Sequence, residues 1–292
     1  MPGILLALLL RGPIADNLVL SLITGFGAVL CIASANYVIN EWLDRDFDRL
    51  HPTKSARAAV QRELRGELVF AEWLFFALAG LGLAALCSTA TVWLAAIFAM
   101  QGLVYNVPPI RSKDRAYIDV VSEAVNNPLR FMIGWSMIDP TTIPPSSILL
   151  AYWTAGAFLM AAKRLSEYRQ LAASHGTQLL VRYRASFAGY SEISLTASCF
   201  LYALLSSFFM AIFLVKYRIE YIVCFPVLAA LFVHYLALSM KPESAAQSPE
   251  KLYRETILMG LVALLGLLFV AATFIDVPAL ETLTSQHYIT LQ

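Results

Sequence analysis

The sequence has 292 residues, of which 59% are hydrophobic and 14% are charged, and its mean hydropathy is +0.67. Soluble domains typically carry about 25% charged residues, so the composition excludes an ordinary soluble protein and favours an all-α integral membrane protein. The formal net charge of +1 identifies no partner. We expect a surrounding membrane lipid as a partner and no nucleic acid; the sequence does not reveal protein partners.

Long apolar runs predict the spanning helices. The run at residues 3–10 is too short to cross about 30 Å of hydrocarbon, and we expect it to be the end of a truncated first helix. The full spans are expected at 17–40, 68–88, 91–107, 119–138, 147–166, 192–215, 219–239 and 255–275. Residues 1–292 then form a single polytopic membrane domain.

Basic residues gather in alternate loops of this span list. Most of the 21 Lys and Arg residues lie in four segments, 41–67, 107–118, 163–191 and 240–254. Because loops rich in Lys and Arg stay on the cytoplasmic side, we expect these segments to form a cytoplasmic cap. The expected location is the bacterial inner (plasma) membrane, with the active-site loops in the cytoplasm.

Polar residues recur every fourth position at the end of the 17–40 span: Asn36, Asn40, Asp44 and Asp48. If the helix continues, they share one face, where oxygen ligands can converge on a hard cation such as Mg²⁺. The basic residues Lys54 and Arg57 follow and supply counter-charge for phosphates. The alternative is a solvated helix end with ordinary acidic residues, and the Asn-Asp-Asp repeat beside a membrane favours the functional interpretation.

A second polar stripe lies within the 119–138 span and comprises Asp119, Glu123, Asn127 and Arg130. Charge at membrane depth is expensive and usually functional, so we interpret the stripe as a second metal or phosphate shell. An internally paired stripe that holds helices together is the alternative. Three further candidates for contact with a phosphate or its metal precede it: Tyr105, Arg111 and Lys113.

A third basic cluster begins with Lys163 and Arg164 at the end of the 147–166 span. One interpretation is added phosphate recognition, and the other is an ordinary positively charged cytoplasmic loop.

These motifs resemble those of the UbiA superfamily of intramembrane prenyltransferases. Asn40-x-x-x-Asp44-x-x-x-Asp48 resembles its first aspartate-rich motif, residues 105–113 resemble its YSxPPxRxK loop, and Asp119-x-x-x-Glu123 takes the place of its second acidic motif. The resemblance implies about nine transmembrane helices around a central cavity that opens laterally to lipid. It also implies Mg²⁺ that bridges a donor diphosphate between the two acidic motifs.

The resemblance implies the following metal ligands: Asn40, Asp44, Asp48, Asp119 and Glu123. The four acids among them are the expected catalytic residues. The expected substrate contacts are Asn36, Asn40, Lys54, Arg57, Tyr105, Arg111, Lys113, Asn127, Arg130, Lys163 and Arg164.

Residues 48–57 are similar to the DRxHPxKxxRP string of decaprenyl-phosphate phosphoribosyltransferases. This similarity favours phosphoribosyl transfer from phosphoribosyl diphosphate to a polyprenyl phosphate. Prenyl transfer from a prenyl diphosphate to an aromatic or quinone-precursor acceptor is the main alternative, which Asn126-Asn127 and the proline-rich loop favour. A non-enzymatic transporter is a third hypothesis, and it predicts acids scattered along a pathway at the membrane midplane instead of gathered near one face.

Overall fold

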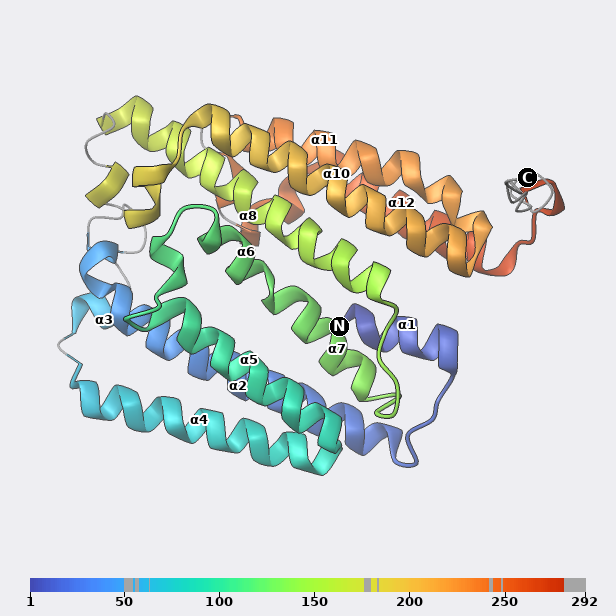
Figure 1. The fold of residues 1–292 in the computed structure, drawn as a ribbon, viewed down its shortest axis with the longest axis horizontal. Helices are drawn as coiled ribbons and strands as arrows, with labels where there is room; N and C mark the ends of the chain where they lie inside the picture. The colour runs from blue at the N-terminus through green and yellow to red at the C-terminus, as the bar shows by residue number, and fades with distance from the viewer. Residues whose placement is uncertain are drawn as a thin grey trace, which may run out of the picture.

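The computed structural model describes residues 1–49, 55, 58–62, 64–175, 180–182, 184–241, 244–247 and 249–280. Every regular element within those ranges is helical, and Figure 1 shows their arrangement. The α-helices are α1 (Pro2–Arg11), α2 (Leu18–Asp48), α3 (Ala58–Gln61), α4 (Gly66–Cys87), α5 (Thr89–Asn106), α6 (Ile118–Ala124), α7 (Asn126–Ser136), α8 (Ser146–His175), α10 (Glu192–Tyr217), α11 (Phe225–Ser239) and α12 (Thr256–Phe274). The 3₁₀ turns are η2 (Ser112–Asp114), η3 (Ala185–Gly189), η4 (Ile219–Cys224), η5 (Ala245–Gln247) and η6 (Pro249–Arg254).

Six helical segments of the described chain are long and apolar enough to cross a membrane: α2, α4, α8, α10, η4–α11 and α12. They present apolar side chains outward; on α12 only Leu258 and Ala272 are buried, while Leu267 is 69% exposed. A helix that exposes so much apolar surface needs lipid around it. The protein is therefore an all-α integral membrane protein, as its composition predicts.

The helices lie roughly side by side in two groups (Figure 1). Helices α2, α4 and α5 pack together, and so do α8, α10, α11 and α12. Helices α6 and α7 lie between the groups, and α1 packs against α7. The contact between α1 and α7 requires a glycine at position 3, since a Cβ there would lie 2.0 Å from the carbonyl oxygen of Phe131.

Helix α2 extends beyond the predicted 17–40 span, so the first part of the predicted 41–67 loop is helical. Residues 41–48 contain no Gly or Pro to interrupt the helix. The continuation places Asn36, Asn40, Asp44 and Asp48 on one face of a rigid helix, as their spacing predicts. Similarly, α8 continues through His175 into the predicted 163–191 loop.

The chain forms two helices within the predicted 119–138 span, and they meet at Val125. Pro128 lacks an N–H, so the carbonyl of Ala124 has no hydrogen-bond donor four residues later. The N–H of Val125 also departs from the α-helical pattern, because it donates to the carbonyl of Ser122, three residues back, at 3.3 Å. The break lies between Glu123 and Asn127, within the predicted polar stripe.

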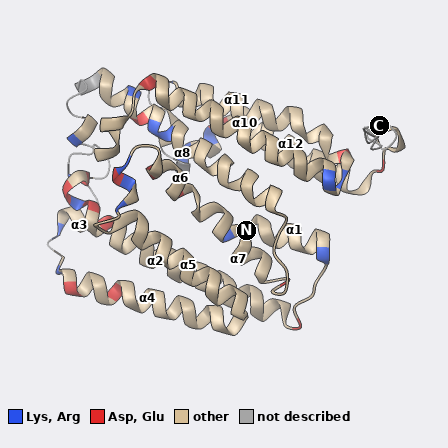
Figure 2. Ribbon diagram, in the orientation of Figure 1, with Lys and Arg blue, Asp and Glu red and all other residues tan. Residues whose placement is uncertain are grey.

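Charged residues gather at the ends of the helices, whereas the middle of the bundle is largely uncharged (Figure 2). The C-terminal ends of α2, α5 and α8 lie at one end of the molecule, which we term the charged end (Figure 1). At the opposite end, Arg11 donates to the buried carboxylate of Asp139 at 3.0 Å. The candidate site lies at the charged end.

Candidate active site

The first half of the site surrounds Asp44 on α2. Lys113 Nζ lies 2.5 Å from Asp44 Oδ1, and Arg111 Nη2 donates to the same oxygen at 3.0 Å. Lys113 also donates to Asn40 Oδ1 at 3.2 Å and to Asn106 Oδ1 at 2.8 Å. Four residues that the sequence predicts to share a site, Asn40, Asp44, Arg111 and Lys113, are thus in direct contact.

The loop between α5 and α6 is held tightly in this position. Arg111 has a φ of 32°, in the left-handed region that is unfavourable for a residue with a side chain. Its guanidinium donates to Asp114 at 2.8 Å and to the carbonyl oxygen of Asn106 at 3.1 Å, which compensates for the strain. Burial lowers the pKa of Lys113 to about 8, although the nearby Asp44 carboxylate opposes that shift.

The second half of the site surrounds Glu123 on α6. Arg164 Nη2 donates to Glu123 Oε2 at 3.0 Å, and the Tyr105 hydroxyl donates to the same oxygen at 2.7 Å. That hydroxyl also accepts from Arg184 Nη2 at 3.0 Å. Because Lys113 Nζ lies 6.0 Å from the centroid of the Tyr105 ring, Tyr105 touches both halves.

Asp119 is fully buried beneath this second half. Its Oδ1 accepts from the Tyr190 hydroxyl at 2.7 Å, and its Oδ2 accepts from Ser186 Oγ at 3.1 Å and from Arg164 Nε at 3.3 Å. Arg184 Nε lies 3.5 Å from Oδ2. Internal donors therefore occupy both oxygens, and the metal-binding role predicted for Asp119 stays a prediction.

Sequence reasoning assigned no site role to Ser186, and it grouped Tyr190 only with the third basic cluster as a candidate for phosphate recognition, not with Asp119. Both belong to the η3 turn and the residue that follows it, and they reach Asp119 across the fold. The only available signal was their four-residue spacing on a cap segment next to Arg184, which sequence alone could not connect to Asp119.

Asn36 and Asp48, the other predicted site residues of α2, lie about two turns before and one turn after Asp44. Asn36 donates to the carbonyl of Phe98 at 3.0 Å within the contact between α2 and α5. Asp48 is buried at the end of α2. The predicted phosphate contacts Lys54 and Arg57 lie outside the described residues.

Asn127 and Arg130 lie beyond the helix break and contact each other. Arg130 Nη2 donates to Asn127 Oδ1 at 2.8 Å, and Arg130 Nε donates to the carbonyl of Asn126 at 3.1 Å. Lys163 instead lines an apolar cavity of about 570 Å³ between α8, α11 and α12. The structure therefore places Asn127 and Arg130 farther from the charged end than Glu123, whereas Lys163 directly precedes Arg164 of the site on α8.

The oxygen donors of the first half suit a hard cation. Asn40, Asp44 and Asp48 supply amide and carboxylate oxygens from one face of α2, and Mg²⁺ commonly takes one or two carboxylates together with substrate oxygens. Within the described ranges, no three His, Cys, Asp or Glu side chains form a ready-made metal cluster. The donor chemistry fits Mg²⁺ provided that a substrate supplies further oxygens.

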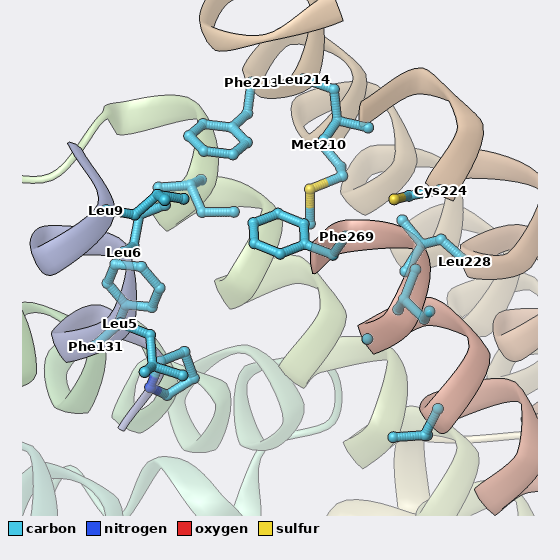
Figure 3. Close-up of a pocket in the computed structure, with 15 residues that line it drawn as sticks. Leu5, Leu6, Leu9, Phe131, Met210, Phe213, Leu214, Cys224, Leu228 and Phe269 are labelled. Carbon is cyan, nitrogen blue, oxygen red and sulfur yellow. The ribbon is translucent and has the colours of Figure 1, made fainter. Parts of the chain in front are cut away.

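A second apolar cavity of about 400 Å³ lies between α1, α7, α8, α10, α11 and α12. Figure 3 shows labelled side chains of α1, α10 and α12, among them Leu6, Met210 and Phe269, around a common space. Leu228 and Val262 line both this cavity and the one at Lys163, so the two cavities are neighbours. Their lining suits a hydrocarbon chain.

The sequence of this chain is similar to those of known proteins. Residues 1–254 match the UbiA prenyltransferase family. A decaprenyl-phosphate phosphoribosyltransferase from Mycolicibacterium smegmatis is 30% identical over 185 residues, which cover 60% of this chain and 55% of that relative. The chain thus matches only about half the length of that relative.

Solved structures of a UbiA homologue from Archaeoglobus fulgidus share the fold. The structure with DMAPP and Mg²⁺ gives a TM-score of 0.64 at 21% identity, and the structure with GPP and Mg²⁺ gives 0.65 at 22%. Both comparisons cover 90% of this chain and 88% of the other. The chain belongs to the UbiA prenyltransferase family.

Proposed function

We propose that the protein is a Mg²⁺-dependent transferase that moves a phosphoribosyl group from phosphoribosyl diphosphate to a polyprenyl phosphate. The observation that carries the proposal is the pairing of carboxylates with cations in both halves of the site. Asp44 meets Lys113 and Arg111, and Glu123 meets Arg164. Such a site offers metal ligands and phosphate-binding cations side by side.

In the proposed reaction, the bond between the ribose C1 and the diphosphate oxygen breaks and the diphosphate leaves. An oxygen of the lipid phosphate forms the new bond to C1. Negative charge accumulates on the leaving diphosphate, and we assign Arg111, Lys113 and Arg164 to stabilise it. Lys54, Arg57 and Lys163 are further proposed phosphate contacts.

Asn40, Asp44 and Asp48 would hold one Mg²⁺, and Glu123, together with Asp119 in the sequence prediction, would hold another. The metal, when bound, supplies Lewis-acid stabilisation of the diphosphate oxygens. Tyr105 orients the Glu123 carboxylate through its hydroxyl.

Three observations support phosphoribose as the transferred group and a polyprenyl phosphate as the acceptor. The phosphoribosyltransferase of M. smegmatis is 30% identical to the matched part of this chain. The string at residues 48–57 is similar to that of the same enzymes. The two apolar cavities offer room for a lipid chain. Because phosphoribosyl diphosphate is water-soluble, we place the site on the cytoplasmic side of a bacterial inner membrane.

A comparison of two donors tests the proposal. Purified protein is incubated with a polyprenyl phosphate and labelled phosphoribosyl diphosphate, and separately with labelled prenyl diphosphate and an aromatic acceptor, each with Mg²⁺ or EDTA. We expect label from phosphoribose in the lipid fraction only when Mg²⁺ is present. Prenyl transfer without phosphoribosyl transfer would replace the proposal with its main alternative, and transfer of neither group would reject both.

A further inference from the structure

Arg130 is the only charged residue of α7 and lies far from both ends of the α6–α7 segment. At a rise of 1.5 Å per residue, it lies about 18 Å along the helices from Ile118 at the charged end. It lies about 9 Å before Ser136, the last residue of α7 toward the opposite end. A guanidinium at this depth in a membrane protein is expensive to maintain and calls for a functional partner.

The guanidinium of Arg130 is held by a residue that packs against the neighbouring helix α8. Asn127, its hydrogen-bond partner, lies so close to α8 that a Cβ on Gly156 would be 1.9 Å from Asn127 Nδ2. Glu123, one turn before Asn127, contacts Tyr105 of α5 and Arg164 of α8. Arg130 follows Asn127 by three residues and therefore lies next to it on the surface of α7, one turn farther from the charged end.

Unlike the other arginines of the site, Arg130 has no acidic partner among the residues that the structure describes. Arg111, Arg164 and Arg184 each lie within 4.0 Å of a carboxylate oxygen. The described acceptors of Arg130 are a backbone carbonyl and a side-chain amide, both neutral. The residue is nevertheless exposed, so its charge is available to an anionic ligand.

The depth of Arg130 relative to Glu123 fits a second phosphate. Seven residues separate them, which corresponds to about 10.5 Å along the helices. In the proposed transfer, the attacking oxygen and the leaving diphosphate lie on opposite sides of the ribose carbon. A diphosphate at Glu123 and a phosphate at Arg130 would leave space between them for one pentose ring.

We propose that Arg130, oriented by Asn127 and the carbonyl of Asn126, binds the phosphate of the acceptor lipid within the bundle. This inference rests on the proposed function. The hydrocarbon would extend into the apolar cavity of about 400 Å³, which the next residue, Phe131, lines (Figure 3). The headgroup and the chain of one lipid would thus contact adjacent residues of α7.

Binding without turnover tests this inference. Purified protein in detergent is titrated with a polyprenyl phosphate, with the uncharged polyprenol of the same length, and with 4-hydroxybenzoate as an aromatic carboxylate. We expect the wild type to bind the phosphate about 10-fold or more tightly than the alcohol, and Arg130→Gln to lose this preference. Arg130→Lys keeps the charge but not the planar fork, and is expected to retain part of it.

Lys216→Gln is the matched control, because it removes an exposed cation at the opposite end of the bundle. It is expected to bind all three ligands like the wild type. Mg²⁺-dependent binding of phosphoribosyl diphosphate to Arg130→Gln should equal that of the wild type, which also shows that the variant is folded.

Equal wild-type affinity for the phosphate and the alcohol would overturn the inference, as would an unchanged preference in Arg130→Gln. Tighter binding of 4-hydroxybenzoate than of the lipid phosphate would assign Arg130 to an aromatic acid instead. The proposed function fails by a different result. In that case, the wild type gives the expected binding results but transfers no phosphoribose to the lipid.

Discussion

Tyr105 is the residue through which the two halves of the site meet. Its hydroxyl lies between Glu123 and Arg184, and its ring faces Lys113. A hydrogen bond to a charged group contributes about 1.5–3 kcal/mol, which is enough for the Tyr105 hydroxyl to hold the Glu123 carboxylate in one orientation. We therefore assign Tyr105 a positioning role.

Tyr105→Phe removes the hydroxyl and keeps the ring. We expect kcat/KM for phosphoribosyl transfer to fall at least about 10-fold, because Glu123 loses an orienting donor. Tyr253→Phe, which changes an exposed tyrosine near the same end, is the control and should leave kcat/KM unchanged. Equal activity of both variants would show that the Tyr105 hydroxyl does not orient Glu123.

The pairing of Asp44 with Lys113 was partly predictable from sequence, whereas the surroundings of Asp119 were not. Asn and Asp residues at four-residue spacing identify a helical face, and the resemblance of residues 105–113 to the YSxPPxRxK loop brings Lys113 into the same predicted site. By contrast, Ser186 and Tyr190 reach Asp119 from a turn 67 and 71 residues later in the chain. Only the packing of η3 against α6 brings these groups together.

At the scale of the element, the break between α6 and α7 sets the direction of the polar stripe. Pro128 prevents one continuous helix and leaves the Ala124 carbonyl without its usual donor. The break therefore determines how Glu123 on α6 is aligned with Asn127 and Arg130 on α7.

Pro128→Ala restores the missing donor and allows α6 and α7 to merge. We expect an unchanged or higher melting temperature together with a lower kcat, because the two parts of the stripe rotate relative to each other. Pro226→Ala, at the start of α11 where proline is well tolerated, is the control. Loss of stability in Pro128→Ala with unchanged kcat would contradict this account.

Just beyond the end of α7, the buried carboxylate of Asp139 forms an ion pair with the partly exposed Arg11 of α1. Burial alone would raise the pKa of Asp139, but hydrogen bonds from Thr141 and Thr142 and the contact with Arg11 outweigh it and lower that pKa. Because the folded-state pKa is lowered, the stabilisation is present above the ordinary aspartate pKa and is lost as the pH falls below it.

Asp139→Asn is expected to lower the free energy of unfolding at neutral pH by about 2 kcal/mol, since a charged hydrogen-bond network loses its charge. The measurement is thermal unfolding in detergent. Asp16→Asn is the control, because Asp16 forms no ion pair within the part of the chain that the structure describes. The difference between wild type and Asp139→Asn should shrink below about pH 4. A difference that is independent of pH would exclude an ionic contribution.

At the scale of the whole molecule, the distribution of basic residues predicts which end faces the cytoplasm. Single cysteines at Arg254 and at Lys216 would lie at opposite ends of the bundle. In intact cells with a permeabilised outer membrane, we expect a membrane-impermeant maleimide to label Lys216→Cys but not Arg254→Cys, with the wild type as background. The reverse pattern would invert the orientation and place the site outside the cytoplasm.

The sequence predicts the overall class and most helices because the apolar runs alone determine which segments enter lipid. Spans such as 68–88 and 192–215 differ from α4 and α10 by only a few residues at each end. Hydropathy alone misses the continuation of α2 beyond residue 40, where the residues are polar, and the break at Val125, which depends on Pro128. Hydropathy reports burial in lipid and carries no information on backbone hydrogen bonding.

The central claim is that the polar groups between α2 and α6 bind a Mg²⁺-bound diphosphate. Equilibrium binding of labelled phosphoribosyl diphosphate to the purified protein, with Mg²⁺ or with EDTA, tests this most directly. Asp44→Asn changes the proposed ligand, while Asp46→Asn changes an exposed aspartate on the same helix. We predict Mg²⁺-dependent binding to the wild type and Asp46→Asn, weakened at least about 10-fold in Asp44→Asn. Binding that is equal in all three proteins and unaffected by EDTA would contradict the claim.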